Sequence, residues 1–127
     1  MEKFHRGIDF SAQLGTETSA TGNATVIEVE EGDWGYGNMV ILDHGFGYKT
    51  RYAHLQNAAV RKGQKVKRGQ LVGYIGNSGK TTGVHLHYEV LKNDVPIDPI
   101  NFFYNDLTPE EYDQILQHSI LPTQTID

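Results

Sequence analysis

Two of the six histidines in this sequence lie two residues apart, in a run that alternates as β-strands do. Successive strand side chains point to opposite faces, so His85, His87 and Glu89 share one face. The apolar residues between them share the other face, which we expect to be buried: Val84, Leu86, Tyr88 and Val90. Two imidazoles at one point of a strand suit metal binding or proton transfer, although an isolated pair of this kind is more often structural.

A second pair of potential ligands lies near the start of the chain. His5 and Asp9 are four residues apart, which places them on one side of an extended segment or of a helix. Gly7 and the β-branched Ile8 between them favour the extended conformation. An imidazole and a carboxylate suit zinc, and catalytic zinc sites combine three protein ligands with one open position. His5, Asp9 and one histidine of the later pair would complete such a set.

His54 is a third candidate for chemistry. In the run from Thr50 to Leu55, alternation predicts that Thr50, Tyr52 and His54 share a face. A half-buried structural histidine is one interpretation. The functional one is a general base, or a hydrogen-bond donor to the transition state, beside the metal. The remaining histidines, His44 and His118, are interpreted as a turn residue and a solvated residue.

These candidates depend on strands to position them, and the sequence has the pattern for several. Fourteen glycines, clustered between apolar runs, predict many turns and a mostly β fold. The turns are expected near residues 32–35, 44–47, 77–79 and 92–94. Besides an extended segment at residues 4–10, strands are expected at residues 25–30, 39–42, 49–55, 71–75 and 84–90.

One helix is predicted, close to the C-terminus. Thr108 as N-cap, Pro109 at the first helical position and Glu111 as a capping-box residue precede apolar residues at helical spacing. Farther upstream, the segment Val60–Gln64 recurs as Val66–Gln70. We expect this repeat to form short β segments with glycine turns. Its basic residues favour a solvated face over a binding patch for an anionic polymer.

Composition narrows the class of protein. At 127 residues the chain fits one domain, and its formal net charge of −5 argues against nucleic acid as the main partner. The absence of cysteine excludes disulfides and cysteine-ligated zinc. No apolar run approaches the roughly 18 residues of a membrane span, and the first residues do not have the pattern of a signal peptide.

Four separated motifs, in this order, resemble the LytM/lysostaphin-type zinc metallopeptidases, which cleave peptide bonds in peptidoglycan. The motifs are His5-Arg6-Gly7-Ile8-Asp9-Phe10, Gly35-Tyr36-Gly37-Asn38, Tyr52-Ala53-His54-Leu55 and Gly83-Val84-His85-Leu86-His87-Tyr88-Glu89-Val90. The resemblance extends from Phe4 to about Phe103. It implies a small antiparallel β-sheet or barrel-sandwich-like catalytic domain at residues 1–104, followed by a C-terminal helix and polar tail at residues 105–127.

The resemblance also assigns roles to residues. It implies that His5, Asp9 and His87 bind one zinc ion per chain, which activates water and polarises the scissile carbonyl, and that His54 and His85 are the catalytic histidines. Which of the two is the general base stays open. Other expected roles are substrate binding by Asn38 and Tyr52 and orientation of a ligand by Glu89.

The implied partner is peptidoglycan, and the implied location is the bacterial cell envelope or periplasm. A D-alanyl–diaminopimelate cross-link is favoured over a glycine bridge as the bond that is cut. Members of the family normally carry a further stretch ahead of the first motif. Because this chain begins four residues before His5, we expect the substrate groove to be incomplete at its N-terminal edge.

Three alternative functions fit the sequence less well. A catalytically inactive family member, acting as a hydrolase activator or binding module, would typically have lost metal ligands, whereas all five chemical residues are present. A biotinyl or lipoyl carrier would need a modified lysine at a hairpin tip, which is not evident. A P-loop is excluded because Tyr74 stands where its first glycine belongs.

Overall fold

The computed structural model describes residues 7–79 and 83–97, and in this part of the chain nine strands and no helix are found. All the strand pairs are antiparallel. The strands are β1 (Gly7–Ser11), β2 (Glu17–Ser19), β3 (Ala24–Glu30), β4 (Asn38–Gly45), β5 (Tyr48–Ala58), β6 (Lys65–Val66), β7 (Leu71–Ile75), β8 (His85–Lys92) and β9 (Val95–Ile97).

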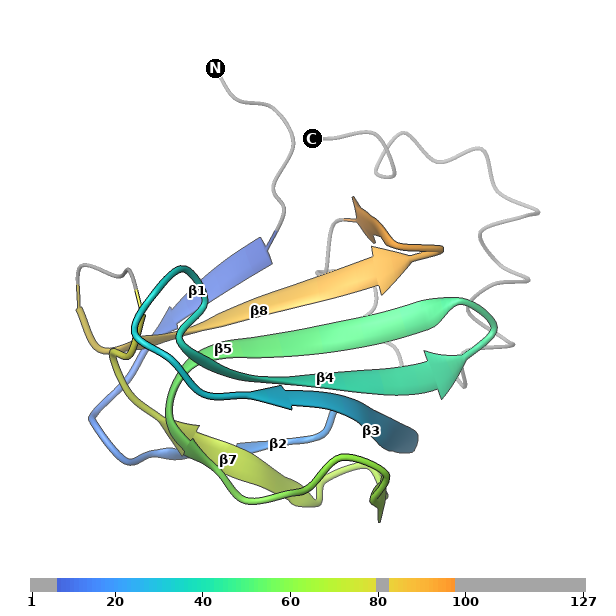
Figure 1. Cartoon of the computed structure of the whole chain (residues 1–127), viewed down its shortest axis with the longest axis horizontal. Helices are drawn as coiled ribbons and strands as arrows, with labels where there is room; N and C mark the ends of the chain where they lie inside the picture. The colour runs from blue at the N-terminus through green and yellow to red at the C-terminus, as the bar shows by residue number, and fades with distance from the viewer. Residues whose placement is uncertain (1–6, 80–82, 98–127) are drawn as a thin grey trace.

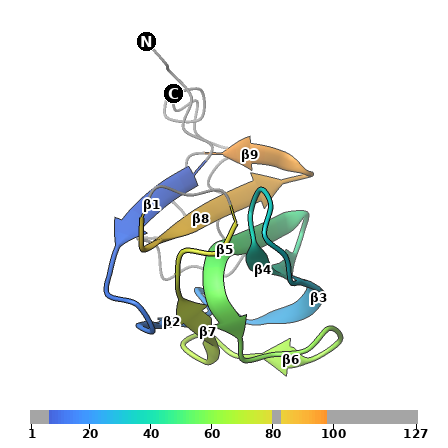
Figure 2. The ribbon, with the colours of Figure 1, turned by 60° about the vertical axis from the view of Figure 1, so that its left-hand side comes forward.

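The strands form one sheet in the order β1-β8-β5-β4-β3-β6, with β7 paired to β5 and β2, and β9 paired to β8. The sheet curls, so that β2 and β7 lie below β3 in Figure 1, and β6, which pairs with β3, lies at the bottom of Figure 2. As a result β8, near the C-terminal end of the described residues, lies between β1 and β5. This placement unites the motifs that are far apart in the sequence.

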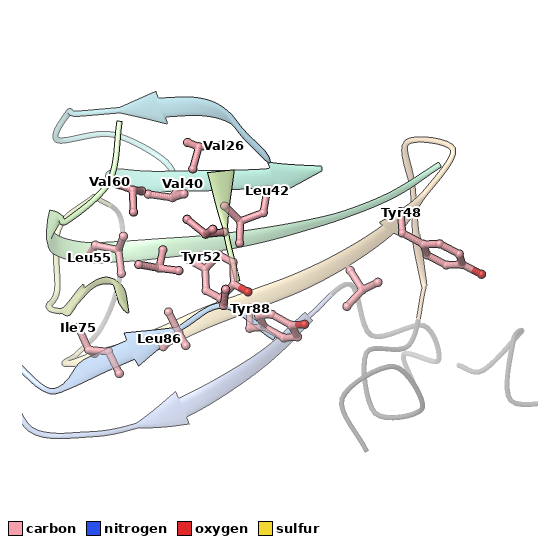
Figure 3. Packing of buried hydrophobic residues seen from close by; sticks show 14 residues of the cluster. Val26, Val40, Leu42, Tyr48, Tyr52, Leu55, Val60, Ile75, Leu86 and Tyr88 are labelled. Atoms are coloured by element: carbon pink, nitrogen blue, oxygen red, sulfur yellow. The ribbon is translucent and has the colours of Figure 1, made fainter. Parts of the chain in front are cut away.

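The core lies on the inner face of the curled sheet, where aliphatic and tyrosine side chains from β3, β4, β5, β7 and β8 pack together (Figure 3). Val40, Leu42 and Val90 have no exposed surface. Tyr52 and Tyr88, each 1% exposed, meet edge to face with ring centroids 5.3 Å apart. Burial of these apolar faces provides the main driving force for folding and leaves the other face of β8 for chemistry.

The structure confirms the mostly β antiparallel fold, and β3, β4, β5, β7 and β8 coincide with predicted strands. Three strands of two or three residues, β2, β6 and β9, were not predicted because so few residues show no period. The turn predicted at residues 44–47 begins later than expected: His44 and Gly45 still belong to β4. The predicted C-terminal helix, His118 and the boundary at residue 104 lie outside the described residues.

The repeated segment forms two turns of the same design. In the first, the Gln64 amide donates to the carbonyl of Arg61 (3.0 Å), and the Arg61 amide donates to the Gln64 side chain (3.1 Å). In the second, Gln70 and Lys67 repeat both bonds at 2.9 and 3.0 Å. The glycine before each glutamine has a positive φ, 92° and 85°, which explains its presence in both copies. The glycine turns are as expected in both copies, whereas the only strand within the repeat is the end of β6 at Val66.

Among residues 7–79 and 83–97, no helix has the length and apolar character needed to cross a membrane.

Candidate active site

Strand pairing gathers the candidate residues on one face of three neighbouring strands. His87 of β8 stands opposite Asp9 of β1 and opposite Ala53 of β5, and Glu89 stands opposite Arg51. Directly paired residues project to the same face of a sheet, so these side chains share the face that carries His85. Leu86, Tyr88 and Val90 lie in the core on the other face, as predicted from alternation. The residues that share this face, which we call the site face, include Asp9, Arg51, Ala53, His85, His87 and Glu89.

Asp9 and His87 are in direct contact. The Nδ1 nitrogen of His87 lies 2.8 Å from Oδ1 of Asp9 although the two residues are 78 positions apart. The Nε2 nitrogen of His85 lies 3.6 Å from the same oxygen. The side chain of Asp9 is 60% exposed and those of the histidines about one-fifth, so the group opens to solvent on the side of Asp9.

The second ring nitrogen of His87 faces Glu89. Nε2 of His87 lies 2.8 Å from Oε2 of this buried carboxylate. The hydrogen bond to Glu89, with a further contribution from Asp9, raises the pKa of His87. Burial disfavours the Glu89 carboxylate, but the hydrogen bond from His87 and the charge of Arg51 outweigh it and lower the pKa of Glu89. Glu89 therefore accepts a hydrogen bond from Nε2 of His87, and the other ring nitrogen, Nδ1, faces Asp9.

His54 reaches the site because the backbone departs from regular strand geometry. Its φ is 63°, a left-handed conformation that non-glycine residues rarely adopt. Its amide donates to the carbonyl of Tyr36, and its carbonyl accepts from Gly76. The imidazole lies 5.6 Å from that of His85 and 6.0 Å from that of His87, between ring centroids. The twist brings His54 onto the histidine face of the sheet.

The prediction that Thr50, Tyr52 and His54 share a face is therefore wrong. Thr50 and Tyr52 point into the core and are 0% and 1% exposed. The Tyr52 hydroxyl lies within hydrogen-bonding distance of both the amide and the hydroxyl of Thr21 (3.2 Å each). Strict alternation would place His54 beside them, but its left-handed backbone reverses the direction of the side chain. Tyr52 therefore lies in the core, on the face of the sheet opposite to His87, and its role in substrate binding stays a prediction.

Asn38 also serves the backbone. Its side-chain oxygen accepts from the Gly32 amide (3.0 Å), and its side-chain nitrogen donates to the carbonyls of Leu55 (3.1 Å) and Gln56 (2.9 Å). With both ends of the amide engaged, Asn38 fixes the 31–37 loop to β5. These bonds support the loop, and the substrate contact expected of Asn38 stays a prediction.

The tautomer of His54 follows from its partner. Nδ1 lies 2.8 Å from the carbonyl oxygen of Ser78, and a carbonyl can only accept. Nδ1 therefore carries a hydrogen, and in the neutral ring the lone pair is on Nε2. Burial lowers the pKa of His54, and the neighbouring imidazoles of His87 and His85 lower it further, beyond the opposing effect of the bond to Ser78. A neutral imidazole with a free Nε2 is suited to accept a proton.

A cleft of about 270 Å³ opens beside His54 and His87. Gly35 and Tyr36 complete its lining. The ring of Tyr36 stacks on that of His87 with centroids 6.0 Å apart and planes 27° from parallel. A larger hollow of about 510 Å³ between β3, β4 and β6 contains His44. Both ring nitrogens of His44 are hydrogen-bonded, to the Asn23 carbonyl and the Thr50 hydroxyl, so that hollow offers no free imidazole nitrogen.

The cleft wall depends on contact between two glycines. A Cβ atom on Gly37 would lie 2.5 Å from backbone atoms of Ser78 and Gly79, and one on Gly79 would lie 2.4 Å from the Gly37 nitrogen. Both have positive φ, 67° and 76°. Only glycine permits this approach, which holds the loop of Tyr36 against the residues that anchor His54.

Comparison with known proteins identifies the family of this chain. The sequence model of peptidase family M23 matches residues 3–99. This chain belongs to peptidase family M23. It is 43% identical over 94 residues to the peptidoglycan DD-endopeptidase ShyA of Vibrio cholerae. The aligned region covers 74% of this chain and 22% of ShyA. The chain thus spans about a fifth of the length of the curated relatives that it matches first.

Solved structures of peptidases share the fold. A zinc-containing peptidase from Vibrio cholerae aligns with a TM-score of 0.73 and 42% identity, covering 81% of this chain and 31% of that chain. The catalytic domain of the antimicrobial peptidase lysostaphin from Staphylococcus simulans aligns with a TM-score of 0.73 and 30% identity, covering 80% of both chains. The resemblance predicted from the motifs is confirmed.

The donor set of the described residues fits a zinc ion of the kind the M23 family implies, although it is not complete. Asp9 and His87 bring an oxygen and a nitrogen donor together, and Glu89 holds the opposite ring nitrogen, as is usual for a metal-binding histidine. No group of three His, Asp or Glu in residues 7–79 and 83–97 forms a full metal site. His5, the third predicted ligand, lies outside the described residues.

Two residues of the site were missed from the sequence. Tyr36 lines the cleft, and Arg51 pairs with the buried Glu89. A signal for Arg51 was present, because alternation places it on the face opposite Tyr52. Its partner, however, is set by the pairing of β5 with β8, which the local pattern does not specify.

Proposed function

We propose that this chain is a zinc-dependent endopeptidase that hydrolyses peptide bonds in the stem or cross-bridge peptides of peptidoglycan. The observation that carries the proposal is the proximity of Asp9, His54, His85 and His87 to one another on one face of an M23 fold. The peptidoglycan endopeptidases among its relatives support the same substrate class.

In this proposal His5, Asp9 and His87 hold one zinc ion. The assignment of His5 rests on the first sequence motif. The assignment of Asp9 and His87 rests on their contact between β1 and β8. Zinc, when bound, supplies a Lewis acid that activates water and polarises the scissile carbonyl. Glu89 keeps Nε2 of His87 occupied, so that Nδ1 is the nitrogen available on the side of Asp9.

His54 is the proposed general base. Its Nδ1–H is held by the Ser78 carbonyl, and Nε2 accepts a proton from the attacking water and then returns it to the departing amine nitrogen. The proposed role of His85 is to donate a hydrogen bond to the oxyanion that develops on the carbonyl oxygen. The two ring centroids lie 5.6 Å apart with their planes at 71°, which supports a proposal in which both rings act on the same peptide group.

The substrate most consistent with the relatives is a D-alanyl–diaminopimelate cross-link, since several of them are named DD-endopeptidases. Such a substrate places the activity in the bacterial cell envelope. The aligned region makes up about a fifth of the length of these relatives, so the same activity is proposed for this chain rather than taken from them.

The test combines metal analysis with digestion of purified peptidoglycan. We expect one zinc per chain in the wild type and release of cross-link cleavage products. Asp9→Ala and His87→Ala are expected to lose both zinc and activity, whereas Lys49→Ala, which removes only an exposed ion pair with Asp94, is expected to keep both. Wild-type protein that binds no zinc would overturn the metal centre. Wild-type protein that binds zinc but digests no peptidoglycan would favour a binding or activating role.

A further inference from the structure

The buried carboxylate of Glu89 has three partners from three different parts of the chain. Glu89 is 2% exposed. Its Oε1 accepts from Nη1 of Arg51 at 2.5 Å, and its Oε2 accepts from the Tyr36 hydroxyl at 3.0 Å and faces His87 at 2.8 Å. A buried carboxylate is tolerated only when it is paired and hydrogen-bonded, and these contacts meet that requirement.

Arg51 and Tyr36 also hold each other. Nη1 of Arg51 donates to the Tyr36 hydroxyl oxygen at 3.0 Å, and the guanidinium carbon lies 4.4 Å from the centre of the Tyr36 ring. The Tyr36 hydroxyl therefore accepts from Arg51 and donates to Glu89. The same aromatic ring stacks on His87. The 31–37 loop, β5 and β8 are joined at this point, where each residue limits the movement of the others.

The geometry points to Arg51 and Tyr36 as positioning residues of the metal site, which act on His87 through Glu89. This inference rests on the proposed function, because it concerns the affinity of the same site for zinc. Glu89 fixes one nitrogen of the His87 ring, and Tyr36 fixes the plane of the ring. The remaining nitrogen, Nδ1, is then oriented toward Asp9 before any metal arrives. Such support of a metal ligand commonly changes affinity by tenfold or more.

The arrangement differs from an ion pair optimised for stability. Nη1 of Arg51 serves both Glu89 and Tyr36, while the Nε of Arg51 is buried and has no hydrogen-bond partner among the described residues. A buried donor without a partner is unfavourable for stability. The position of Arg51 is explained better by the need to hold Glu89 at His87.

The test measures zinc affinity by competition with a chromophoric chelator, using the purified chain. Arg51→Met and Glu89→Gln are each expected to weaken zinc binding by about 10- to 100-fold, and Tyr36→Phe, which keeps the ring and removes the hydroxyl, by roughly tenfold. Arg51→Lys keeps the charge and is expected to recover part of the loss. The matched control is Lys49→Met, which removes a cation from the same strand and an exposed pair with Asp94.

A double-mutant cycle separates action through Glu89 from a general structural effect. If Arg51 acts through Glu89, the variant that combines Arg51→Met with Glu89→Gln binds zinc as weakly as Glu89→Gln alone. Additive losses, or affinities of Arg51→Met and Tyr36→Phe equal to that of Lys49→Met, would overturn the inference. If Arg51→Met does not fold, Tyr36→Phe and Arg51→Lys decide. Wild-type protein without zinc affinity overturns the proposed function itself, whereas an unaffected Arg51 variant overturns the inference alone.

Discussion

The imidazole of His54 donates from Nδ1 to the carbonyl oxygen of Ser78, a residue 24 positions farther along the chain, at 2.8 Å. This bond selects one tautomer of a histidine whose backbone is left-handed, with φ at 63°. Unusual backbone geometry of this kind is concentrated at functional sites, where the surrounding structure maintains it. The orientation of His54 is therefore set by its own backbone and by the Ser78 carbonyl.

Replacing His54 by alanine tests its role as a proton acceptor. We expect His54→Ala to keep its zinc, because the ligands proposed are other residues, and to lose about 10²- to 10⁴-fold in the rate of peptidoglycan hydrolysis. Zinc content and turnover measured on the same preparation check this. Loss of zinc together with activity would show that His54 is a ligand, and a rate within tenfold of the wild type would remove it from the mechanism.

The contact between Gly37 and Gly79 predicts that alanine destabilises the protein more at Gly37 than at a glycine with open space around it. Gly37→Ala adds a Cβ that would overlap the backbone of Ser78 and strains a positive φ, so we expect a loss of about 2–5 kcal/mol in the free energy of unfolding. Gly63→Ala is the matched control, since its φ of 92° is also positive but its Cβ meets nothing within 4 Å. It is expected to lose only about 1–2 kcal/mol. Chemical denaturation compares the two, and equal losses would contradict the close contact.

Tyr52→Phe separates a core role from a role in the cleft. The variant leaves the amide of Thr21 without its buried acceptor, so the free energy of unfolding should fall by about 1–3 kcal/mol. The catalytic rate and the Michaelis constant at a temperature well below unfolding should not change. A raised Michaelis constant with unchanged stability would support the role in substrate binding that the sequence analysis predicted for Tyr52.

His44 gives the fold a defined dependence on pH. Burial lowers the pKa of His44 to about 4, whereas the unfolded chain titrates near 6.5. Between these values the unfolded state binds a proton that the folded state does not. Stability is therefore complete above about pH 6.5 and falls by about 3 kcal/mol as the pH drops toward 4.

The variant His44→Gln is expected to lack this part of the pH dependence. The difference between the two proteins, measured by denaturation from pH 7 to pH 4, isolates the contribution of one histidine because the other titrating groups are common to both. Parallel curves for wild type and variant would show that folding does not lower the pKa of His44.

Much of the site was predictable because β8 is a regular strand. Alternation alone placed His85, His87 and Glu89 on one face, and the structure agrees. The same rule failed in β5, where it assigned His54 to the face of Tyr52. A left-handed residue reverses the direction of a side chain, and no glycine or asparagine marks the position in the sequence.

The residues that the sequence did not reveal depend on register. Arg51 meets Glu89 only because β5 and β8 pair with these residues opposite each other, 38 positions apart in the chain. Tyr36 reaches the same carboxylate from a loop whose path is set by the contact between Gly37 and Gly79. Local patterns predict which face a side chain occupies, but they do not predict which strand lies beside it.

The position of β1 in the sheet has a consequence for how the site is lost. β1 is the terminal strand of the main path and, in the described part of the chain, pairs with β8 alone. Peripheral strands of this kind detach in local openings that require far less free energy than unfolding of the whole domain. Asp9 would leave with β1 while the core under Tyr88 stays packed. Under heat or denaturant, the protein should therefore lose its capacity to retain metal before the core around Tyr52 and Tyr88 is exposed. A bound ion would in turn stabilise the pairing of β1 with β8.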